Sequence, residues 1–344
     1  MSMKHLSASG ALSRRTLMKG LALPLLAGAL GMSAATQALA QDAVAGYPSR
    51  TVTLVVPFPA GGATDITARL VAEGLSKKWG KSVVVENRPG AGGNLGSEYV
   101  ARAAPDGYTL VLGVTGSHGI NTSLYKNMRY DPRKDFEPIT QATLYPNAIV
   151  VNNNVPANNL TELIALLKKD PGQFSYGSDG NGTASHLGME LLKNRGGFQI
   201  AHVPYRGSAP MVTDLLGGQI QVGITGLPAV QAYAKTGKLK LIALTTGTRF
   251  ASAPDYPTVA EQGFAGFAAP PWSGFFAPKG TPKALVEKIS ADMREVMADP
   301  VAKQKMVAAG SEFTPSTPDQ FRAFVDQEIA KWAEAVKISG AQVD

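Results

Sequence analysis

One glycine-rich turn could bind an anion without using any charged side chain. The segment VVPFPAGGATDITARLVA, residues 55–72, runs from an apolar strand through Gly61 and Gly62 directly into a helix. The first turn of a helix carries unpaired N–H donors and about half a positive charge, which together stabilise a docked anion. Glycine lets the backbone approach a ligand closely. The segment therefore predicts an anion site built from backbone amides.

Two further turns have a similar composition, RPGAGGN at residues 88–94 and GSDGNGTASH at residues 177–186. Two such turns facing each other across a cleft would hold both ends of a dianion. A purely structural role stays open for each turn, and RPGAGGN is the strongest candidate for it. RPGAGGN lacks the G-x-G-x-x-G spacing because Leu95 stands five places after Gly90, and the chain has no G-x-x-x-x-G-K-[ST] loop. Nucleotide phosphates are therefore poorly supported as ligands.

Residue types that usually carry catalysis or metal ions are few in this chain. His118, His186 and His202 show no H-x-x-x-H spacing, so we expect no zinc site. We interpret His186 and His202 as hydrogen-bonded structural or cleft residues. The sequence contains no cysteine, which excludes disulfides and thiolate chemistry. No cofactor fingerprint is found, and we expect no cofactor.

A penicillin-interacting serine enzyme is an alternative of a different class. SLYK at residues 123–126 matches S-x-x-K and residues 235–237 match K-T-G, but S-D-N is absent because Gly180 follows Ser178 and Asp179. Residues 235–237 are more simply a helix end followed by glycine. S-x-x-K is short enough to occur by chance. Labelling with a fluorescent penicillin would separate an enzyme from a binding protein.

Strands and helices must hold the glycine-rich turns in position. Along the chain, apolar runs of strand length alternate with helical patterns, which is typical of parallel βαβ units. Proline, glycine and capping residues delimit the last two helices. We predict strands at residues 51–56, 82–86, 108–114, 174–176, 200–203, 221–224 and 239–244, and helices at residues 65–79, 95–103, 160–169, 183–194, 209–216, 282–299 and 318–339.

The length of 344 residues exceeds one ordinary domain of about 100–200 residues, so two lobes are expected. A composition change near residues 130–160 indicates a crossing between lobes, and PPWSGFFAPKGTP at residues 270–282 indicates the return. We therefore assign residues 41–143 and 270–344 to lobe 1 and residues 144–269 to lobe 2.

The first forty residues predict an export signal. Arg14 and Arg15 are followed by an apolar run at residues 20–35 and by the small-residue site ALA at residues 38–40. The arginine pair resembles the twin-arginine signal. An uncleaved anchor is the alternative, but the charge-free stretch is barely ~20 residues and contains Pro24. We expect cleavage near Ala40 and a protein free in the periplasm, since no cysteine is present for a lipid anchor.

The net charge is concentrated at the start of the chain. Of the formal charge of +7, the basic residues before position 41 account for +4, which leaves +3 on the remainder. No Lys/Arg-rich run with interleaved aromatic residues follows, so we expect no nucleic-acid partner. With 44% hydrophobic and 17% charged residues, the composition fits a soluble α/β protein.

Five separated motifs resemble the Bug family, the tripartite tricarboxylate transporter substrate-binding receptors of TctC type. The resemblance runs from about Tyr47 to the C-terminus with the motifs in the same order. They are VPFPAGGATDITAR, ENRPGAGGNLGSEYVARAAPDGYTL, HVPYRGSAPMVTDLLGGQ, DYPTVAEQGF and WSGFFAPKGTP.

This resemblance implies a two-lobed α/β periplasmic binding protein of type II-like architecture. Each lobe would be a mostly parallel sheet flanked by helices, with the ligand cleft between the lobes. The protein would capture a small carboxylate and deliver it to the membrane subunits of a tripartite tricarboxylate transporter. Presentation of the ligand to a membrane sensor kinase stays open, and a monomer is expected.

The resemblance also implies the ligand-binding residues. Amides of the first turn would donate to one carboxylate, beside the apolar wall of Phe58, with Asp65 capping or orienting the helix. Arg206 could pair with a carboxylate, although a surface arginine explains it nearly as well. The implied set is Phe58, Ala60, Gly61, Gly62, Ala63, Thr64 and Asp65 in the first turn, Thr115 and Ser117 after the third strand, Gly180, Asn181, Gly182, Thr183 and Ala184 in the second lobe, and Tyr205, Arg206 and Gly207 in the turn after V-P-Y.

The identity of the carboxylate stays open. A di- or tricarboxylate, an acidic amino acid and an aromatic acid are all candidates, and Phe58 and Trp272 permit the last without requiring it. Because the predicted donors are backbone amides, the sequence predicts the class of the ligand but not which carboxylate it is.

Overall fold

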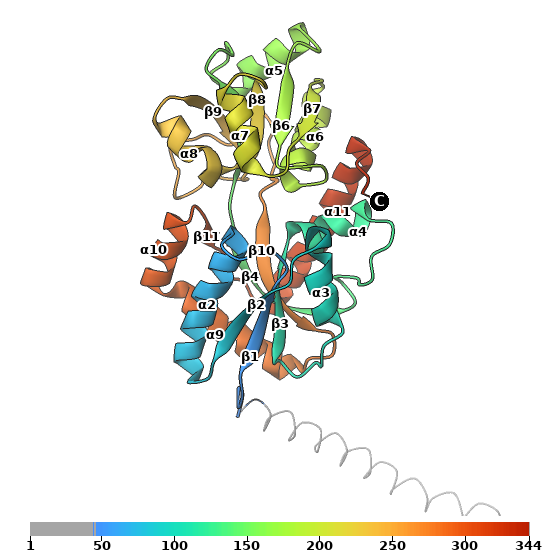
Figure 1. Ribbon diagram of the computed structural model, residues 1–344, viewed down its shortest axis with the longest axis vertical. Coiled ribbons are helices and arrows are strands. Elements are labelled where there is room, and N and C mark those ends of the chain that lie inside the picture. The colour runs from blue at the N-terminus through green and yellow to red at the C-terminus, as the bar shows by residue number, and fades with distance from the viewer. Residues whose placement is uncertain (1–43, 45, 344) are drawn as a thin grey trace, which may run out of the picture. The chain divides into compact units, whose positions relative to one another are not determined.

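The computed structural model describes residue 44 and residues 46–343. The predicted export signal and its cleavage near Ala40 lie outside the described residues. Among those that are described, no helix combines the length and the apolar character needed to cross a membrane. Pro48–Asp344 forms one structural unit, in which two sheets are flanked by helices (Figure 1).

The first sheet has six strands in the order β11, β4, β10, β3, β1, β2. β1 pairs in parallel with β2 and β3, whereas β10 runs antiparallel to both β3 and β4. The bounds of these strands are β1 Val52–Val56, β2 Val83–Asn87, β3 Thr109–Val114, β4 Phe136–Leu144, β10 Trp272–Pro278 and β11 Glu312–Phe313.

The second sheet has five strands in the order β7, β6, β8, β5, β9. β6 pairs in parallel with β7 and β8, whereas β5 runs antiparallel to β8 and β9. The bounds are β5 Asn147–Asn152, β6 Ser175–Ser178, β7 Ala201–Pro204, β8 Val222–Gly226 and β9 Leu239–Leu244.

The α/β class with two helix-flanked sheets is confirmed, and both sheets combine parallel with antiparallel strand pairs. Each sheet contains three parallel strands and then continues with antiparallel ones. The reason is that the segments running between the sheets are themselves strands. β4 ends at Leu144 in the first sheet and β5 begins at Asn147 in the second, while β10 returns antiparallel beside β4.

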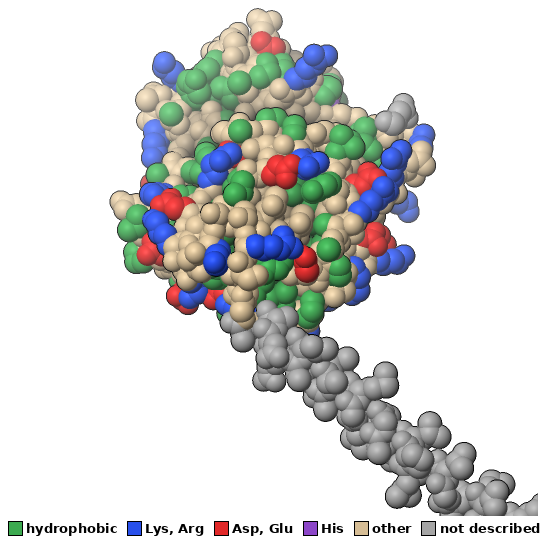
Figure 2. Space-filling model, turned by 60° about the horizontal axis from the view of Figure 1, so that its bottom comes forward, with side chains coloured by type: hydrophobic (Ala, Val, Ile, Leu, Met, Phe, Trp, Pro, Cys, Tyr) green, Lys and Arg blue, Asp and Glu red, His purple; other side chains and the backbone are tan. Residues whose placement is uncertain are grey.

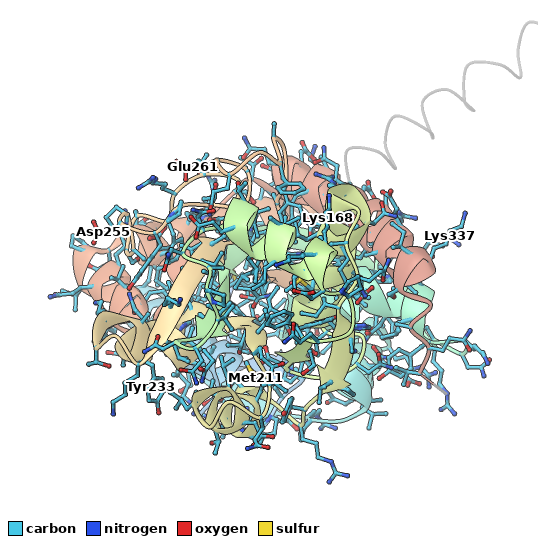
Figure 3. The ribbon with its side chains drawn as sticks, turned by 90° about the horizontal axis from the view of Figure 1, so that it is seen from above. Lys168, Met211, Tyr233, Asp255, Glu261 and Lys337 are labelled. Atoms are coloured by element: carbon cyan, nitrogen blue, oxygen red, sulfur yellow. The ribbon has the colours of Figure 1, made fainter. Side chains whose placement is uncertain are left out.

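Helices cover both faces of the second sheet. Along β5, Ile149 and Val151 belong to the apolar cluster under α5 and α6, while Ala148 and Val150 belong to the cluster under α7 and α8. This alternation follows from the two-residue period of a strand. Figure 3 looks onto this part of the protein, with Lys168 on α5, Met211 on α7 and Tyr233 on α8 labelled. The bounds are α5 Leu160–Lys169, α6 Ala184–Gly196, α7 Ser208–Leu216 and α8 Leu227–Lys235.

The helices of the first sheet are delimited as the sequence predicts at most of their ends. Gly80 closes α2 in the left-handed conformation, and Thr317 with Gln320 forms the predicted capping box of α11. In Figure 1 these helices flank the lower sheet. They are α2 Ala63–Trp79, α3 Asn94–Ala101, α4 Asn121–Leu124, α9 Lys283–Ala298, α10 Pro300–Ala308 and α11 Pro318–Ser339, with short turns η1 Ala91–Gly93 and η2 Gly116–Ile120.

The last helix reaches from the first sheet to the helices of the second. Phe321 near its start packs with Phe276 of β10, whereas Trp332 further along belongs to the same buried cluster as Leu187 of α6. The strand-bearing segments change sheets after Leu144 and before Trp272. The lobe boundaries at residues 144 and 270 stay a prediction.

Surface charge is interspersed on the face that Figure 2 shows, where basic and acidic side chains alternate. Ion pairs at the surface include Lys77 with Glu73 and Lys78 with Glu295. Pairs of this kind neutralise each other locally.

Candidate functional site

A cavity of about 450 Å³ lies where the ends of strands from the two sheets meet. Its walls come from the loops after β1, β3, β6 and β8 and from the crossings next to β5 and β10. Seven of the predicted ligand-binding residues line it: Phe58, Ala63, Thr115, Asn181, Gly182, Thr183 and Ala184.

The β1–α2 turn, residues 57–62, brings the start of α2 to this cavity. Gly61 has a φ of 87°, a conformation that favours glycine, and Gly62 caps α2 without any side-chain hydrogen bond. Within the described residues, no hydrogen bond uses the amides of Gly62, Ala63, Thr64 or Asp65. The N-terminus of α2 therefore offers a row of free donors beside the cavity.

Asp65 organises this turn from behind. Its carboxylate accepts from the Gly61 amide at 2.9 Å and from Arg69 at 2.8 and 3.0 Å. Asn87 donates both to Asp65 at 2.9 Å and to the Phe58 carbonyl at 3.0 Å. The hydrogen bond from Arg69 lowers the pKa of Asp65 to about 2, with the Gly61 amide adding to the effect.

This arrangement agrees with the orienting role expected for Asp65. It also leaves one fewer backbone amide free for a ligand than the sequence predicts. The Gly61 amide, predicted to meet an anion, is already bonded to Asp65. Ala60 and Gly62 are exposed and, like Thr64, do not line the cavity with their own atoms. The free donors closest to the cavity wall are those around Ala63.

RPGAGGN lies next to the β1–α2 turn. A Cβ on Gly93 would stand 3.3 Å from the Phe58 ring, and Gly92 lines the cavity with its carbonyl accepting from Asn121 at 3.3 Å. Gly93 has a φ of 95°. The glycines of this segment therefore let the chain pass beneath Phe58, in keeping with a structural role.

The end of β3 places Thr115 in the wall but Ser117 behind it. The Thr115 hydroxyl donates to the Trp272 carbonyl at 3.1 Å and accepts from the Trp272 amide at 2.7 Å. Ser117 is fully buried and bonds to His118 Nδ1 at 2.9 Å. Burial lowers the pKa of His118 to about 3, and the ring stacks on Phe276. Thr115 reaches the cavity, whereas Ser117 and His118 support its wall.

The β6–α6 turn, residues 179–183, uses most of its amides internally. Gly180 donates to Ser178 Oγ at 3.2 Å, Gly182 donates to His186 Nδ1 at 3.1 Å, and the Thr183 amide donates to the Gly180 carbonyl at 3.3 Å. Thr183 caps α6 by accepting from the His186 amide. Within the described residues, Asn181 is the one residue of this turn whose backbone amide has no protein partner, and the amides of Ala184 and Ser185 at the start of α6 have none either.

His186 and His202 stack with their centroids 4.0 Å apart. His202 Nε2 bonds to Ser178 Oγ at 2.7 Å, and burial lowers the pKa of both histidines, to about 4 for His202. In the described part of the chain, no group of three or more histidine, aspartate or glutamate side chains is placed to hold a metal ion. Both histidines are hydrogen-bonded structural residues, His186 in the first turn of α6 and His202 in β7.

The three predicted residues of the turn after β7 support the cavity without lining it. Tyr205 donates to Asp214 at 2.7 Å, and the Gly207 amide donates to the Asp179 carbonyl at 3.1 Å. Arg206 is exposed, and Ser208 is the residue of this turn that lines the cavity. The structure thus brings Tyr205, Arg206 and Gly207 near the site but not to its surface.

The sequence interpretation did not include the polar floor formed by the second sheet. Thr225 donates to Asp179 Oδ1 at 2.6 Å, and burial raises the pKa of Asp179. Burial, with Asp179 nearby, also raises the pKa of Tyr145 to about 12. Asn147 is 1% exposed and its side-chain Nδ2 has no partner. Asp179, Tyr145, Asn147, Ser185 and Thr225 all line the cavity.

The lining is nearly free of charge. Within the described residues, no lysine, arginine or histidine lines the cavity, and Asp179 is its one carboxylate. Any anion bound here would be held by amides, hydroxyls and the helix N-terminus.

Comparison with known proteins decides the family. The model of the tripartite tricarboxylate transporter family receptor, TctC, matches residues 67–340. The chain belongs to this family. The resemblance of its motifs to the Bug and TctC receptors is thereby confirmed.

Relatives of this TctC-family receptor agree over nearly their whole length. Protein BugT of Bordetella pertussis is 35% identical over 316 residues, which cover 91% of this chain and 97% of BugT. A solved structure of an R. palustris protein with adipate is 36% identical, has a TM-score of 0.74 and covers 86% of this chain and all of that one. MatC of Rhodopseudomonas palustris with bound malate is 31% identical, has a TM-score of 0.70 and covers 84% of this chain and all of that one.

The enzyme alternative is not supported for this TctC-family receptor, because its relatives are solute-binding receptors. The two strings that raised it have structural explanations. SLYK overlaps the short helix α4, and Thr236 and Gly237 end α8, with Gly237 at a φ of 68°.

Proposed function

We propose that this protein is a periplasmic receptor that captures a small carboxylate and delivers it to the membrane subunits of a tripartite tricarboxylate transporter. The observation that carries the proposal is the row of free amides at the start of α2, beside a cavity lined by Ala63. A carboxylate docked there receives several N–H donors and the positive end of the helix dipole. No cofactor takes part.

Two relatives with bound dicarboxylates support the ligand class. One holds adipate and the other malate, and both share the fold and more than 30% of their residues with this chain. A cavity of about 450 Å³ matches small organic acids of this size. The proposed ligand-binding residues are those of the β1–α2 turn around Ala63, with Phe58, Thr115 and the cavity-lining part of the β6–α6 turn.

The export signal and the single soluble unit complete the proposal. The residues before position 41 direct the chain to the periplasm, where it works as a monomer after cleavage near Ala40. N-terminal sequencing of the exported protein and its mass in solution test this part directly.

A thermal-shift screen tests the ligand class. A carboxylate at about 100 times its Kd stabilises the protein by about 2.7 kcal/mol, whereas neutral sugars leave the melting temperature unchanged. The screen would include dicarboxylates, tricarboxylates, acidic amino acids and aromatic acids. Stabilisation by sugars with no response to any acid would refute the proposal.

Transport is separated from signalling by deleting the gene for this receptor. The proposal expects uptake of the radiolabelled ligand to be lost and to return when the intact gene is restored. The alternative role of presenting the ligand to a membrane sensor kinase expects normal uptake and a lost transcriptional response.

A further inference from the structure

The polar floor of the cavity carries a carboxylate, Asp179. In a receptor for carboxylates, a positively charged side chain would be the expected group at such a position. Asp179 follows β6 and lines the cavity, and it is the one charged side chain of the described lining. No basic side chain of the described residues is ion-paired with it. Its charge is therefore available to a ligand.

The surroundings hold Asp179 in place without neutralising it. Burial raises the pKa of the Asp179 carboxyl, and the hydrogen bond from Thr225 to Oδ1 at 2.6 Å, together with the Ser185 hydroxyl, opposes that shift only in part. The carboxylate therefore gains most from a cation that reaches it. The backbone is fixed too, because the Asp179 amide donates to Ser185 Oγ at 3.1 Å and its carbonyl accepts from Gly207 at 3.1 Å. A carboxylate held this firmly beside a cavity acts as a rigid acceptor.

A free donor stands two strands away on the same floor. β8 lies between β6 and β5, and it pairs Gly226 with Asn147 and Thr225, the hydrogen-bond partner of Asp179, with Ala148. Asn147 is 1% exposed, lines the cavity, and has an Nδ2 group without a partner. A buried amide donor left unpaired costs free energy until a ligand acceptor reaches it. The floor thus combines an unpaired donor with a negatively charged acceptor.

This pairing does not suit an unsubstituted dicarboxylate. One carboxylate can dock on the amides of α2, but a second one reaching the floor would meet the like charge of Asp179. A ligand that carries an ammonium group as well as a carboxylate satisfies both Asp179 and Asn147. An ammonium–carboxylate contact is also a charge-assisted hydrogen bond, which is stronger than a neutral one.

We propose that Asp179 is a specificity-determining residue that makes this receptor select ammonium-bearing carboxylates, that is small amino acids, over plain carboxylates of the same length. The inference deepens the proposed function and rests on it. Asp179 accepts from the ligand ammonium, and the ligand carboxylates go to the start of α2 and to Asn147.

Calorimetric titration with matched ligand pairs tests the selection. The pairs are succinate with aspartate, glutarate with glutamate, and adipate with 2-aminoadipate, and malate tests a hydroxyl in place of the ammonium group. For the pair that binds best, we expect the amino acid to bind at least about tenfold more tightly than the plain acid, the effect of one charge-assisted hydrogen bond. Malate is expected to bind closer to succinate than to aspartate, because a hydroxyl brings no positive charge.

Asp179→Asn removes the charge while keeping an oxygen for the Thr225 hydroxyl. It is expected to bring the affinity ratio of the best pair to within about threefold, since the charge-assisted contact is lost. Asp255→Asn makes the same chemical change at an exposed position and should leave the ratio unaltered. If Asp179→Asn does not fold, Asp179→Ala is measured in its place, and the wild-type pairs already decide the selection.

The outcomes separate this inference from the proposed function. Plain acids that bind as tightly as their amino counterparts, or a ratio that survives Asp179→Asn, overturn the role of Asp179 and leave the carboxylate receptor standing. Failure of every carboxylate, amino-substituted or plain, overturns both.

Discussion

The β1–α2 turn and the β6–α6 turn look alike in sequence and differ in how their amides are used. Both pass from a strand through glycines into a helix. In the β1–α2 turn one side chain, Asp65, takes the single amide of Gly61 and leaves the following amides free. In the β6–α6 turn Ser178 accepts from the Gly180 amide, His186 accepts from the Gly182 amide and Ser185 accepts from the Asp179 amide.

The difference shows that glycine content alone does not make an anion site. Glycine permits the backbone path, but the neighbouring side chains decide which donors stay free. Asp65 lies behind its turn and pulls one amide away from the cavity, while Asp179 lies on the floor of the cavity itself. The first turn therefore suits a carboxylate, and the second suits a group that donates to one.

Proline at the first helical position tests this contrast most strongly. Ala63→Pro removes one free donor from α2, and Gly62 is already extended at φ −81° and ψ 170°, which suits the residue before proline. We expect ligand affinity to fall about 10- to 100-fold, the value of one hydrogen bond to a charged group. Calorimetric titration measures the change.

Ala184→Pro is the matched control in the other turn. Thr183 is extended at φ −77° and ψ 163°, so proline fits equally well at the start of α6. We expect a loss of less than about threefold there, because the proposal places the carboxylate on the amides at the start of α2 and not on the Ala184 amide. Equal losses in the two variants would contradict the contrast between the turns.

Asp65→Ala probes the support behind the first turn. The variant leaves Gly61, Arg69 and Asn87 without their acceptor, so we expect the free energy of unfolding to fall by about 1–3 kcal/mol. Since the pKa of Asp65 is lowered to about 2 in the folded protein, this stability is present above the unfolded value of 3.8 and is lost as pH falls towards 2. Urea unfolding at pH 7 and at pH 3 should show the gap between the variant and the wild type narrowing, and a constant gap would argue against the ion pair.

Acid should loosen the β6–α6 turn before the β1–α2 turn. His186 must be neutral at Nδ1 to accept from Gly182, and burial lowers its pKa from 6.5 in the folded protein, with Glu190 opposing and Lys193 adding to the shift. The stability from this histidine is therefore present above pH 6.5 and is lost as pH falls through the lowered folded value. In hydrogen-exchange measurements, the protection factor of the Gly182 amide is expected to fall between pH 7 and pH 4, while the Gly61 amide keeps its protection factor.

Arg206→Ala gives the smallest expected effect. Arg206 is exposed and lies outside the cavity lining, so its removal should change ligand affinity by less than about twofold. A tenfold loss would mean that the turn after β7 moves into the cavity when ligand binds.

Local sequence signals predict the helices and the parallel strands well because their causes are local. Thr317 and Gln320 cap α11 as predicted, and α5 and β9 have the predicted bounds. The strands β4, β5 and β10 were taken only as crossings, since their role depends on pairing between distant segments. Asp299 was expected only to end a helix, but it also caps α10 by accepting from Ala302.

The site could be predicted in part for the same reason. The position of the β1–α2 turn follows from its glycines, whereas the use of the Gly61 amide by Asp65 depends on side-chain geometry that no spacing rule contains. Asp179 and Asn147 were missed because β6 and β5 are brought together only by β8 between them. The sequence pattern marks where backbone donors gather, and the tertiary fold decides which side chains face them.

Trp272 lies in the wall of the cavity, where its fluorescence can report on a bound ligand. All three tryptophans lie in the described part of the chain, and Trp272 is the one among the residues that line the cavity; its indole N–H donates to Glu328 at 2.8 Å. Trp332 shares that same carboxylate oxygen, and Trp79 is bonded to Asp292 at the end of α2. We therefore expect ligand binding to change the intrinsic emission without any label, and Trp272→Phe to remove that change.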